Sequence, residues 1–315
     1  MAIDYEVEYN NRARVPEHPE IFARWARDGA AYRDEAGNEG RAEIGLKYGP
    51  SPRQTIDLFK PRGGTDGPHA LFIHGGYWRS LEPSSFSQMA RGMNAHGVTV
   101  AVSGYDLAPQ VSIGQIIEQT QQACLYLWKR FNKRMMVSGH SAGGHLAACM
   151  MATDWKKLDA GAPADLAPVG YAISGLYDLE PLLHLATNAD FKLDAAEARR
   201  ISPLFWPVAR GRVLDAVVGG AESSEFLRHS RIIVDGWREK GVETRYKAVP
   251  GMNHFTICDP MTDPSSAMTK RLVELAKKTE NQYFHANTAV STAPTTTITT
   301  RIASCGTRRA KCAPQ

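Results

Sequence analysis

Ser141 stands between two glycines in the stretch GHSAG, residues 139–143, and this spacing suits nucleophilic catalysis. A strand is predicted at 135–138 and a helix from about Ala142, which places the serine on a tight strand-to-helix turn. Side chains two residues before and after the serine would collide with the strand or the helix, and glycine removes those collisions. The turn points the Ser141 hydroxyl out of a sheet. Glycine and serine are also ordinary turn residues, so other residues must decide between catalysis and a plain turn.

A glycine loop in the stretch HGGYW, residues 74–78, follows another predicted strand. Acyl transfer from an ester or amide places negative charge on the carbonyl oxygen, and fixed N–H donors near the serine stabilise that charge. We predict that the N–H groups of Gly76, Tyr77 and Ala142 form this oxyanion hole, with Ala142 at the positive end of its helix. Tyr77, Trp78 and His140 are predicted to line the substrate pocket. A place in the core is the alternative for the two aromatic residues.

Serine needs a general base, and the sequence offers ten histidines. In chains with this elbow the order of the triad is serine, acid, histidine, so the base is expected after the last long strand. His254 lies in a loop directly after the strand predicted at 244–249. The remaining histidines are interpreted as bystanders in catalysis.

The acid is expected after the strand predicted at 213–218. Glu222 comes first in the loop that follows, where its carboxylate could accept a bond from the His254 ring and fix its tautomer. Asp178 follows the preceding strand and is a rival for the same role. Glu225 is a second rival, although it could instead begin a helix as a favourable N-terminal charge.

Short runs rich in apolar and β-branched residues alternate with helical patterns along the chain, which predicts right-handed crossovers and an α/β fold with a mainly parallel sheet. The strands are predicted at 55–59, 70–73, 98–102, 135–138, 169–174, 213–218 and 244–249. Residues 176–206 form a helical insertion, which is either a small cap over the site or an ordinary crossover with a long loop. We predict one catalytic domain over 1–286 and a disordered tail over 287–315, which is rich in Thr and Ala.

The composition argues against several classes of protein. A net charge of +4 without a basic stripe gives no support for nucleic-acid binding. No apolar run reaches the length of a membrane span, and the first residues lack the pattern of a signal peptide, so we expect a cytoplasmic protein without membrane contact. The five cysteines are odd in number and show no paired metal spacing, so buried or incidental thiols are expected rather than a disulfide frame. A homodimer is one candidate assembly.

The motifs HGGYW and GHSAGG resemble those of the kynurenine formamidase (arylformamidase) group of α/β-hydrolases and of the related HGGYW-type esterases. Three further stretches share the likeness, which extends over about residues 5–280: EYNNRARVPEHPEIFARW, SGYDLAP and GGAESSEF. The resemblance implies an eight-stranded, mostly parallel sheet, no metal or organic cofactor, and hydrolysis through Ser141, an acid and His254. It also implies a small aromatic substrate such as N-formylkynurenine. The chain departs from the family at Glu222, where the family often has Asp.

Three functions are therefore carried forward. The first is an arylformamidase that works through an acyl-enzyme intermediate. The second is a carboxylesterase or amidase that uses the same triad on small aryl or short-chain acyl esters. The third is a hydrolase-fold protein that binds a ligand without turnover, against which the retained serine, histidine, acid and glycine loop argue.

Overall fold

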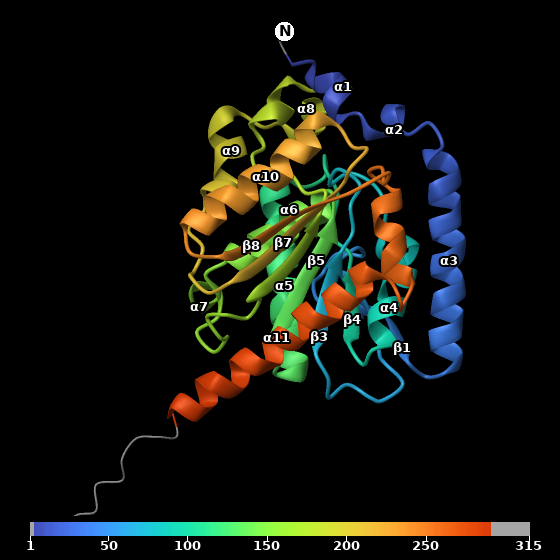
Figure 1. The fold of residues 1–315 in the computed structure, drawn as a ribbon, viewed down its shortest axis with the longest axis vertical. Helices are drawn as coiled ribbons and strands as arrows, with labels where there is room; N and C mark the ends of the chain where they lie inside the picture. Colours follow the sequence, from blue (N-terminus) through green and yellow to red (C-terminus); the bar gives the residue numbers. More distant parts are fainter. Residues whose placement is uncertain (1–2, 291–315) are drawn as a thin grey trace, which may run out of the picture.

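The sheet of this protein has eight strands, as seen in a computed structural model that describes residues 3–290 (Figure 1). The strands are β1 (Ala42–Lys47), β2 (Thr55–Phe59), β3 (His69–Ile73), β4 (Thr99–Ser103), β5 (Met135–His140), β6 (Val169–Ile173), β7 (Val213–Gly219) and β8 (Glu243–Val249). Their spatial order is β1-β2-β4-β3-β5-β6-β7-β8, with β2 antiparallel to both of its neighbours and the other pairs parallel. The predicted α/β fold class is confirmed.

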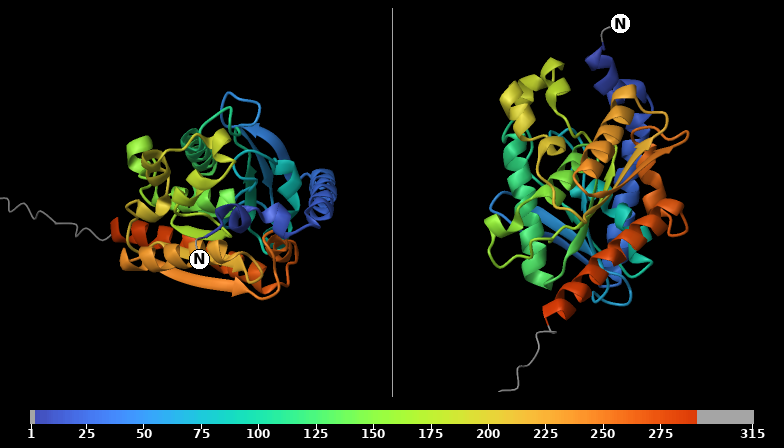
Figure 2. Two further views of the ribbon diagram at one scale, coloured as in Figure 1. Left: turned by 90° about the horizontal axis from the view of Figure 1, so that it is seen from above. Right: turned by 60° about the vertical axis from the view of Figure 1, so that its left-hand side comes forward.

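Helices cover both faces of the sheet (Figure 2). One face packs against α5 (Ile113–Phe131), α6 (Ala142–Ala152) and α10 (Ser224–Glu239). The other packs against α3 (His18–Asn38), η1 (Pro83–Ala90), α4 (Arg91–Asn94), η4 (Thr256–Thr262) and α11 (Ala267–Val290). Side chains alternate across a strand, so successive residues of β3 pack on opposite faces of the sheet. Leu71 lies in the core on the first face and Phe72 in the core on the second.

The N-terminal segment packs against a helix from the C-terminal half of the chain. It contains α1 (Tyr5–Tyr9) and α2 (Asn11–Arg14), and α1 lies beside the start of α10 (Figure 2). Glu8 joins the two helices, because its Oε2 accepts bonds from the Glu225 N–H at 3.0 Å and from the Ser224 hydroxyl at 2.7 Å. A carboxylate at a helix N-terminus satisfies amide groups that have no partner inside the helix.

The insertion between β6 and β7 is built from short helices: η2 (Glu180–His184), α8 (Asn188–Phe191), α9 (Ala195–Arg200) and η3 (Pro203–Phe205).

Outside the insertion, the short helix α7 (Trp155–Leu158) follows α6. The predicted domain boundary at residue 286 falls within α11, and residues 291–315 of the predicted tail lie outside the described part. Within residues 3–290 there is no helix with both the length and the apolar character needed to cross a bilayer.

Candidate active site

Ser141 occupies a single-residue turn between β5 and α6. Its backbone angles, φ 57° and ψ −117°, lie in a region that residues other than glycine rarely adopt, and its N–H donates to the Ile173 carbonyl at 2.8 Å. Such strain persists only where the surrounding structure enforces it. The buried strand before the serine and the buried helix after it supply that enforcement.

The two glycines of the turn are required by close backbone contacts. A Cβ on Gly139 would overlap the Gly143 carbonyl, and a Cβ on Gly143 would overlap the carbonyl oxygen of Ile73 at the end of β3. The collisions expected from the sequence are therefore present, and they involve backbone atoms that cannot rotate away.

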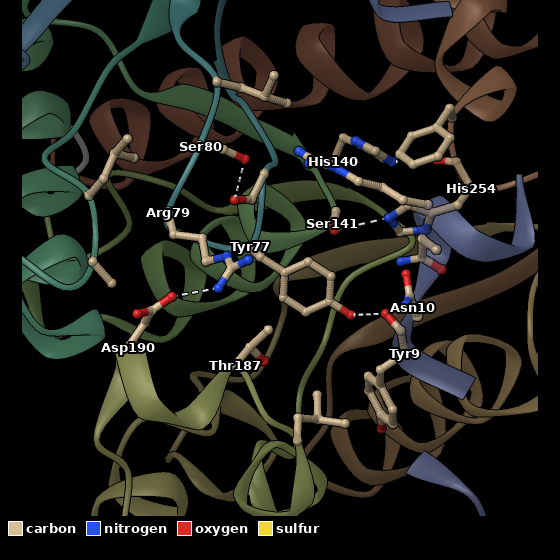
Figure 3. A pocket seen from close by; sticks show the side chains of 18 of the residues that line it. Tyr9, Asn10, Tyr77, Arg79, Ser80, His140, Ser141, Thr187, Asp190 and His254 are labelled. Carbon is tan, nitrogen blue, oxygen red and sulfur yellow. Dashed lines mark hydrogen bonds and ion pairs between the residues drawn. The ribbon is translucent and has the colours of Figure 1, made fainter. Parts of the chain in front are cut away.

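Ser141, His254 and Glu222 form a continuous hydrogen-bonded chain. The Ser141 Oγ lies 3.0 Å from His254 Nε2 (Figure 3), and His254 Nδ1 lies 2.6 Å from Glu222 Oε2. All three residues are buried, with the Glu222 side chain fully excluded from solvent. The geometry orients the imidazole so that Nε2 can accept a proton from the serine hydroxyl.

Glu222 is itself held by two donors on its second oxygen. The Ser174 hydroxyl donates to Glu222 Oε1 at 2.5 Å, and the Gly219 N–H donates to the same atom at 2.7 Å. These bonds fix the carboxylate at the carboxyl ends of β6 and β7, and they leave its Oε2 to the His254 ring.

The two rival acids have other partners. Asp178 accepts a bond from the Glu180 N–H at 3.2 Å. Glu225 forms two bonds with Arg228, at 2.9 and 2.8 Å, and accepts a third from the Tyr9 hydroxyl at 2.8 Å. Of the three carboxylates that the sequence offered, the structure brings Glu222 to the His254 ring.

The loop with the predicted oxyanion donors makes a sharp left-handed turn. Gly76 has φ 110° and Tyr77 has φ 51°, and the Gly76 carbonyl accepts from the N–H groups of Arg79 and Ser80 at 3.0 Å. Within the described residues, the N–H groups of Gly76, Tyr77 and Ala142 have no hydrogen-bond partner. Unpaired amides beside a serine can accept a developing oxyanion.

Tyr77 and Trp78 have different surroundings. The Tyr77 hydroxyl donates to the Tyr9 carbonyl at 2.5 Å, and burial raises the pKa of this phenol well above its usual value. Trp78 is fully buried and packs edge-on against His145 and Phe191. The structure thus differs from the pocket role predicted for Trp78: Tyr77 lines the cavity, whereas the Trp78 ring lies behind it in the core, with the two ring centroids 6.3 Å apart.

A cavity of about 670 Å³ opens onto Ser141 and His254 (Figure 3). Tyr77 and His140 line it, and so do residues that sequence reasoning missed. The missed residues include several from the N-terminal segment, the glycine loop and the insertion: Glu6, Tyr9, Asn10, Arg12, Arg79, Leu185, Thr187 and Asp190. Leu185, Thr187 and Asp190 show that the insertion forms part of the wall, as the cap interpretation requires. Among described residues, no cluster of three His, Cys, Asp or Glu side chains could hold a metal ion.

Comparison with known sequences shows the family to which the chain belongs. The model of a family described as having the alpha/beta hydrolase fold matches residues 70–258, a range that contains both glycine motifs, Glu222 and His254. The chain belongs to this family. Kynurenine formamidase of Danio rerio is 27% identical over 242 residues, covering 74% of this chain and 81% of the relative. The kynurenine formamidase of Salmo salar is 28% identical, covering 75% and 82%. These relatives confirm the predicted resemblance.

Solved structures share the fold of this hydrolase. The crystal structure of a candidate thioesterase from Silicibacter sp. tm1040 has a TM-score of 0.74 and 32% identity, covering 85% of this chain and 98% of that one. A truncated carbohydrate esterase from gut microbiota has a TM-score of 0.62 at 16% identity, covering 75% and 96%, and supports the fold alone.

Proposed function

We propose that this hydrolase is a serine enzyme that cleaves aryl formamides such as N-formylkynurenine through an acyl-enzyme intermediate. The observation that carries the proposal is the hydrogen-bonded chain from Glu222 through His254 to Ser141, in which Ser141 and His254 line the cavity. The kynurenine formamidases among the relatives support the formamide as substrate.

In the first half of the proposed reaction, Ser141 Oγ attacks the formyl carbon while His254 Nε2 takes the hydroxyl proton. The carbonyl oxygen becomes an oxyanion, which the N–H groups of Gly76, Tyr77 and Ala142 stabilise. The C–N bond then breaks, and His254 returns the proton to the leaving aryl amine. This step leaves a formyl ester on Ser141.

In the second half, a water molecule attacks the formyl ester and His254 takes its proton. The second tetrahedral intermediate collapses, the Ser141 oxygen regains the proton from His254, and formate leaves. Each proton is carried by a group of this chain, so the proposed cycle needs no metal and no organic cofactor. Its partner is a small aromatic molecule.

The test compares kcat/KM for N-formyl-L-kynurenine and p-nitrophenyl acetate, with Ser141→Ala as the blank. We expect the formamide to be preferred and Ser141→Ala to abolish both activities while preserving the fold. Ester turnover with a silent formamide would move the protein to the carboxylesterase alternative. Folded wild-type protein without turnover of either would favour a ligand-binding protein.

The base is tested separately by covalent trapping. We expect His254→Ala to resist labelling of Ser141 by an organophosphate at neutral pH, because the hydroxyl would lose its proton acceptor. Labelling of this variant at the wild-type rate would contradict the role of His254.

A further inference from the structure

Two opposite charges face each other on the wall of the cavity. Arg79 Nη1 lies 2.5 Å from Asp190 Oδ2, and both residues line the cavity that opens onto Ser141 (Figure 3). Their side chains are 39% and 38% exposed, so a molecule in the cavity can reach both groups. Arg79 closes the turn of the glycine loop, because its N–H donates to the Gly76 carbonyl. Asp190 lies in α8 of the insertion.

The backbone on each side of this pair is anchored by its neighbours. Trp78 and Phe191, which adjoin Arg79 and Asp190 in sequence, pack edge-to-face with ring centroids 5.8 Å apart. The Asn188 side chain fixes the end of α8, because it donates to the Leu193 carbonyl at 3.0 Å and accepts from the Leu193 N–H at 2.9 Å. The two charged groups therefore project from fixed positions, although they are half exposed.

The pair leaves hydrogen-bonding capacity unused. One bond, from Arg79 Nη1 to Asp190 Oδ2, joins the two side chains. Within residues 3–290, neither the Arg79 Nε and Nη2 donors nor the Asp190 Oδ1 acceptor has another partner. A guanidinium with spare donors suits a carboxylate, and a carboxylate with a spare oxygen suits an ammonium group.

We propose that Arg79 and Asp190 form a recognition subsite for the zwitterionic head of an α-amino acid substrate, with Arg79 on the α-carboxylate and Asp190 on the α-ammonium. The inference rests on the proposed function, because an aryl formamide with an amino-acid side chain carries both groups. On binding, the ion pair between Arg79 and Asp190 would be replaced by one pair between Arg79 and the α-carboxylate and one between Asp190 and the α-ammonium. The net charge of the site would not change, because the zwitterionic head is neutral. A neutral aryl formamide gains nothing from the subsite.

Arg12 is the competing cation in the same cavity. It is exposed, its guanidinium lies 5.6 Å from the centre of the Phe22 ring, and no carboxylate of the described chain pairs with it. A substrate carboxylate could select Arg12 instead of Arg79. Arg12→Gln is therefore the matched control for Arg79→Gln, since each variant removes one cavity guanidinium.

The experiment measures kcat/KM for N-formyl-L-kynurenine and for formanilide, which lacks the amino-acid side chain. For Arg79→Gln and Asp190→Asn we expect at least a tenfold loss on N-formyl-L-kynurenine and less than a twofold change on formanilide. Arg12→Gln should change either value by less than twofold. The charge-swapped double variant R79D/D190R restores an internal ion pair but should not restore activity on N-formyl-L-kynurenine.

Several outcomes would overturn the subsite. An equal loss on both substrates, reversed by the charge swap, would make the pair a structural link between the glycine loop and the insertion. A selective loss for Arg12→Gln alone would move carboxylate recognition to the N-terminal segment. Unchanged kinetics in all variants would leave an ion pair without a role in binding.

A binding assay separates failure of the subsite from failure of the proposed function. If the wild type cleaves no formamide, inhibition of p-nitrophenyl acetate hydrolysis by L-kynurenine and by 2′-aminoacetophenone still reports on the subsite. We expect Arg79→Gln to weaken inhibition by L-kynurenine at least tenfold and to leave inhibition by 2′-aminoacetophenone unchanged. Equal inhibition of wild type and Arg79→Gln by L-kynurenine would contradict the subsite independently of turnover.

Discussion

His140 Nε2 lies 2.6 Å from the backbone carbonyl oxygen of His254. A carbonyl can only accept, so the neutral His140 ring carries its proton on Nε2 and donates it. Burial, and then the neighbouring His254, hold the pKa of His140 well below 6.5, which keeps the ring neutral. The residue before the elbow serine therefore holds the loop that bears the proposed base.

Removal of this donor should disturb the position of His254. We expect His140→Ala to lower kcat about tenfold, because a buried hydrogen bond contributes about 1 kcal/mol and its loss also lets the loop move. His140→Gln places an amide donor at a similar distance and should retain kcat within about threefold. Steady-state kinetics on p-nitrophenyl acetate will show whether His140→Gln retains the kcat that His140→Ala loses. Equal losses in both variants would contradict a role that depends on the donor.

Glu222 is the carboxylate at the His254 ring, and its charge should matter more than its shape. Glu222→Gln should lower kcat by roughly 10³- to 10⁴-fold, because an amide favours the wrong tautomer of the histidine and does not stabilise the imidazolium. Asp178→Asn and Glu225→Gln are the matched controls, and each should leave kcat within about threefold. A loss for Asp178→Asn as large as that for Glu222→Gln would reassign the acid.

Local motifs and long-range contacts differ in how far the sequence reveals them. The turn at Ser141 could be predicted because its demands are local: glycine is needed where a Cβ would meet the strand or the helix. Chain order pointed to His254 and put Glu222 first among three candidate carboxylates, since parallel strands bring the loops at their carboxyl ends together. The choice among Glu222, Asp178 and Glu225 needed the hydrogen bonds of the structure. The strand β1 was not predicted, because it is a half-exposed edge strand of mixed polarity.

Other features depend on geometry that no short pattern records. The different surroundings of Tyr77 and Trp78, one in the cavity wall and the other in the core, accompany two successive positive φ angles, which neither residue type favours. The bond from the Tyr9 hydroxyl to Glu225 joins residues 216 positions apart, and the Arg79–Asp190 pair spans 111 positions. Such contacts depend on the tertiary fold and leave no local pattern, so the cavity wall could not be predicted from the sequence.

Gly143 should be among the least replaceable residues of the chain. Gly143→Ala would drive its Cβ into the carbonyl oxygens of Ile73 and His74, and we expect a loss of about 3 kcal/mol or more in the free energy of unfolding. Gly37, in α3, has open space around its Cβ position, so Gly37→Ala should leave stability unchanged or raise it by up to about 1 kcal/mol. Urea denaturation measures both. Equal stability of the two variants would contradict the steric argument.

The buried His145 predicts a loss of stability in acid. Burial lowers its pKa from 6.5 to about 4, against the opposing bond to the Ile201 carbonyl. Between pH 6.5 and 4 the unfolded chain binds a proton that the folded chain excludes, so stability falls as the pH falls through this window. His145→Gln keeps a donor for Ile201 but cannot titrate. Its free energy of unfolding should depend less steeply on pH, by about 1.4 kcal/mol per pH unit, and an unchanged slope would show that His145 titrates normally.

The Tyr77 hydroxyl links the glycine loop to the N-terminal segment, because it donates to the backbone carbonyl of Tyr9. We expect Tyr77→Phe to lower kcat about fivefold with little change in KM, since loss of a bond worth about 1 kcal/mol frees a strained turn that carries a proposed oxyanion donor.

Tyr9→Phe is the control that separates catalysis from stability. This variant keeps the backbone carbonyl that Tyr77 needs, but it removes the hydroxyl that donates to Glu225 at 2.8 Å and lies 2.6 Å from His229 Nε2. Tyr9→Phe should therefore lower the free energy of unfolding by about 1–2 kcal/mol and leave kcat within about twofold. Thermal unfolding and kinetics of the two variants test this separation. A fall in kcat for Tyr9→Phe equal to that for Tyr77→Phe would show that general loosening of the N-terminal segment, and not the Tyr77 bond, controls turnover.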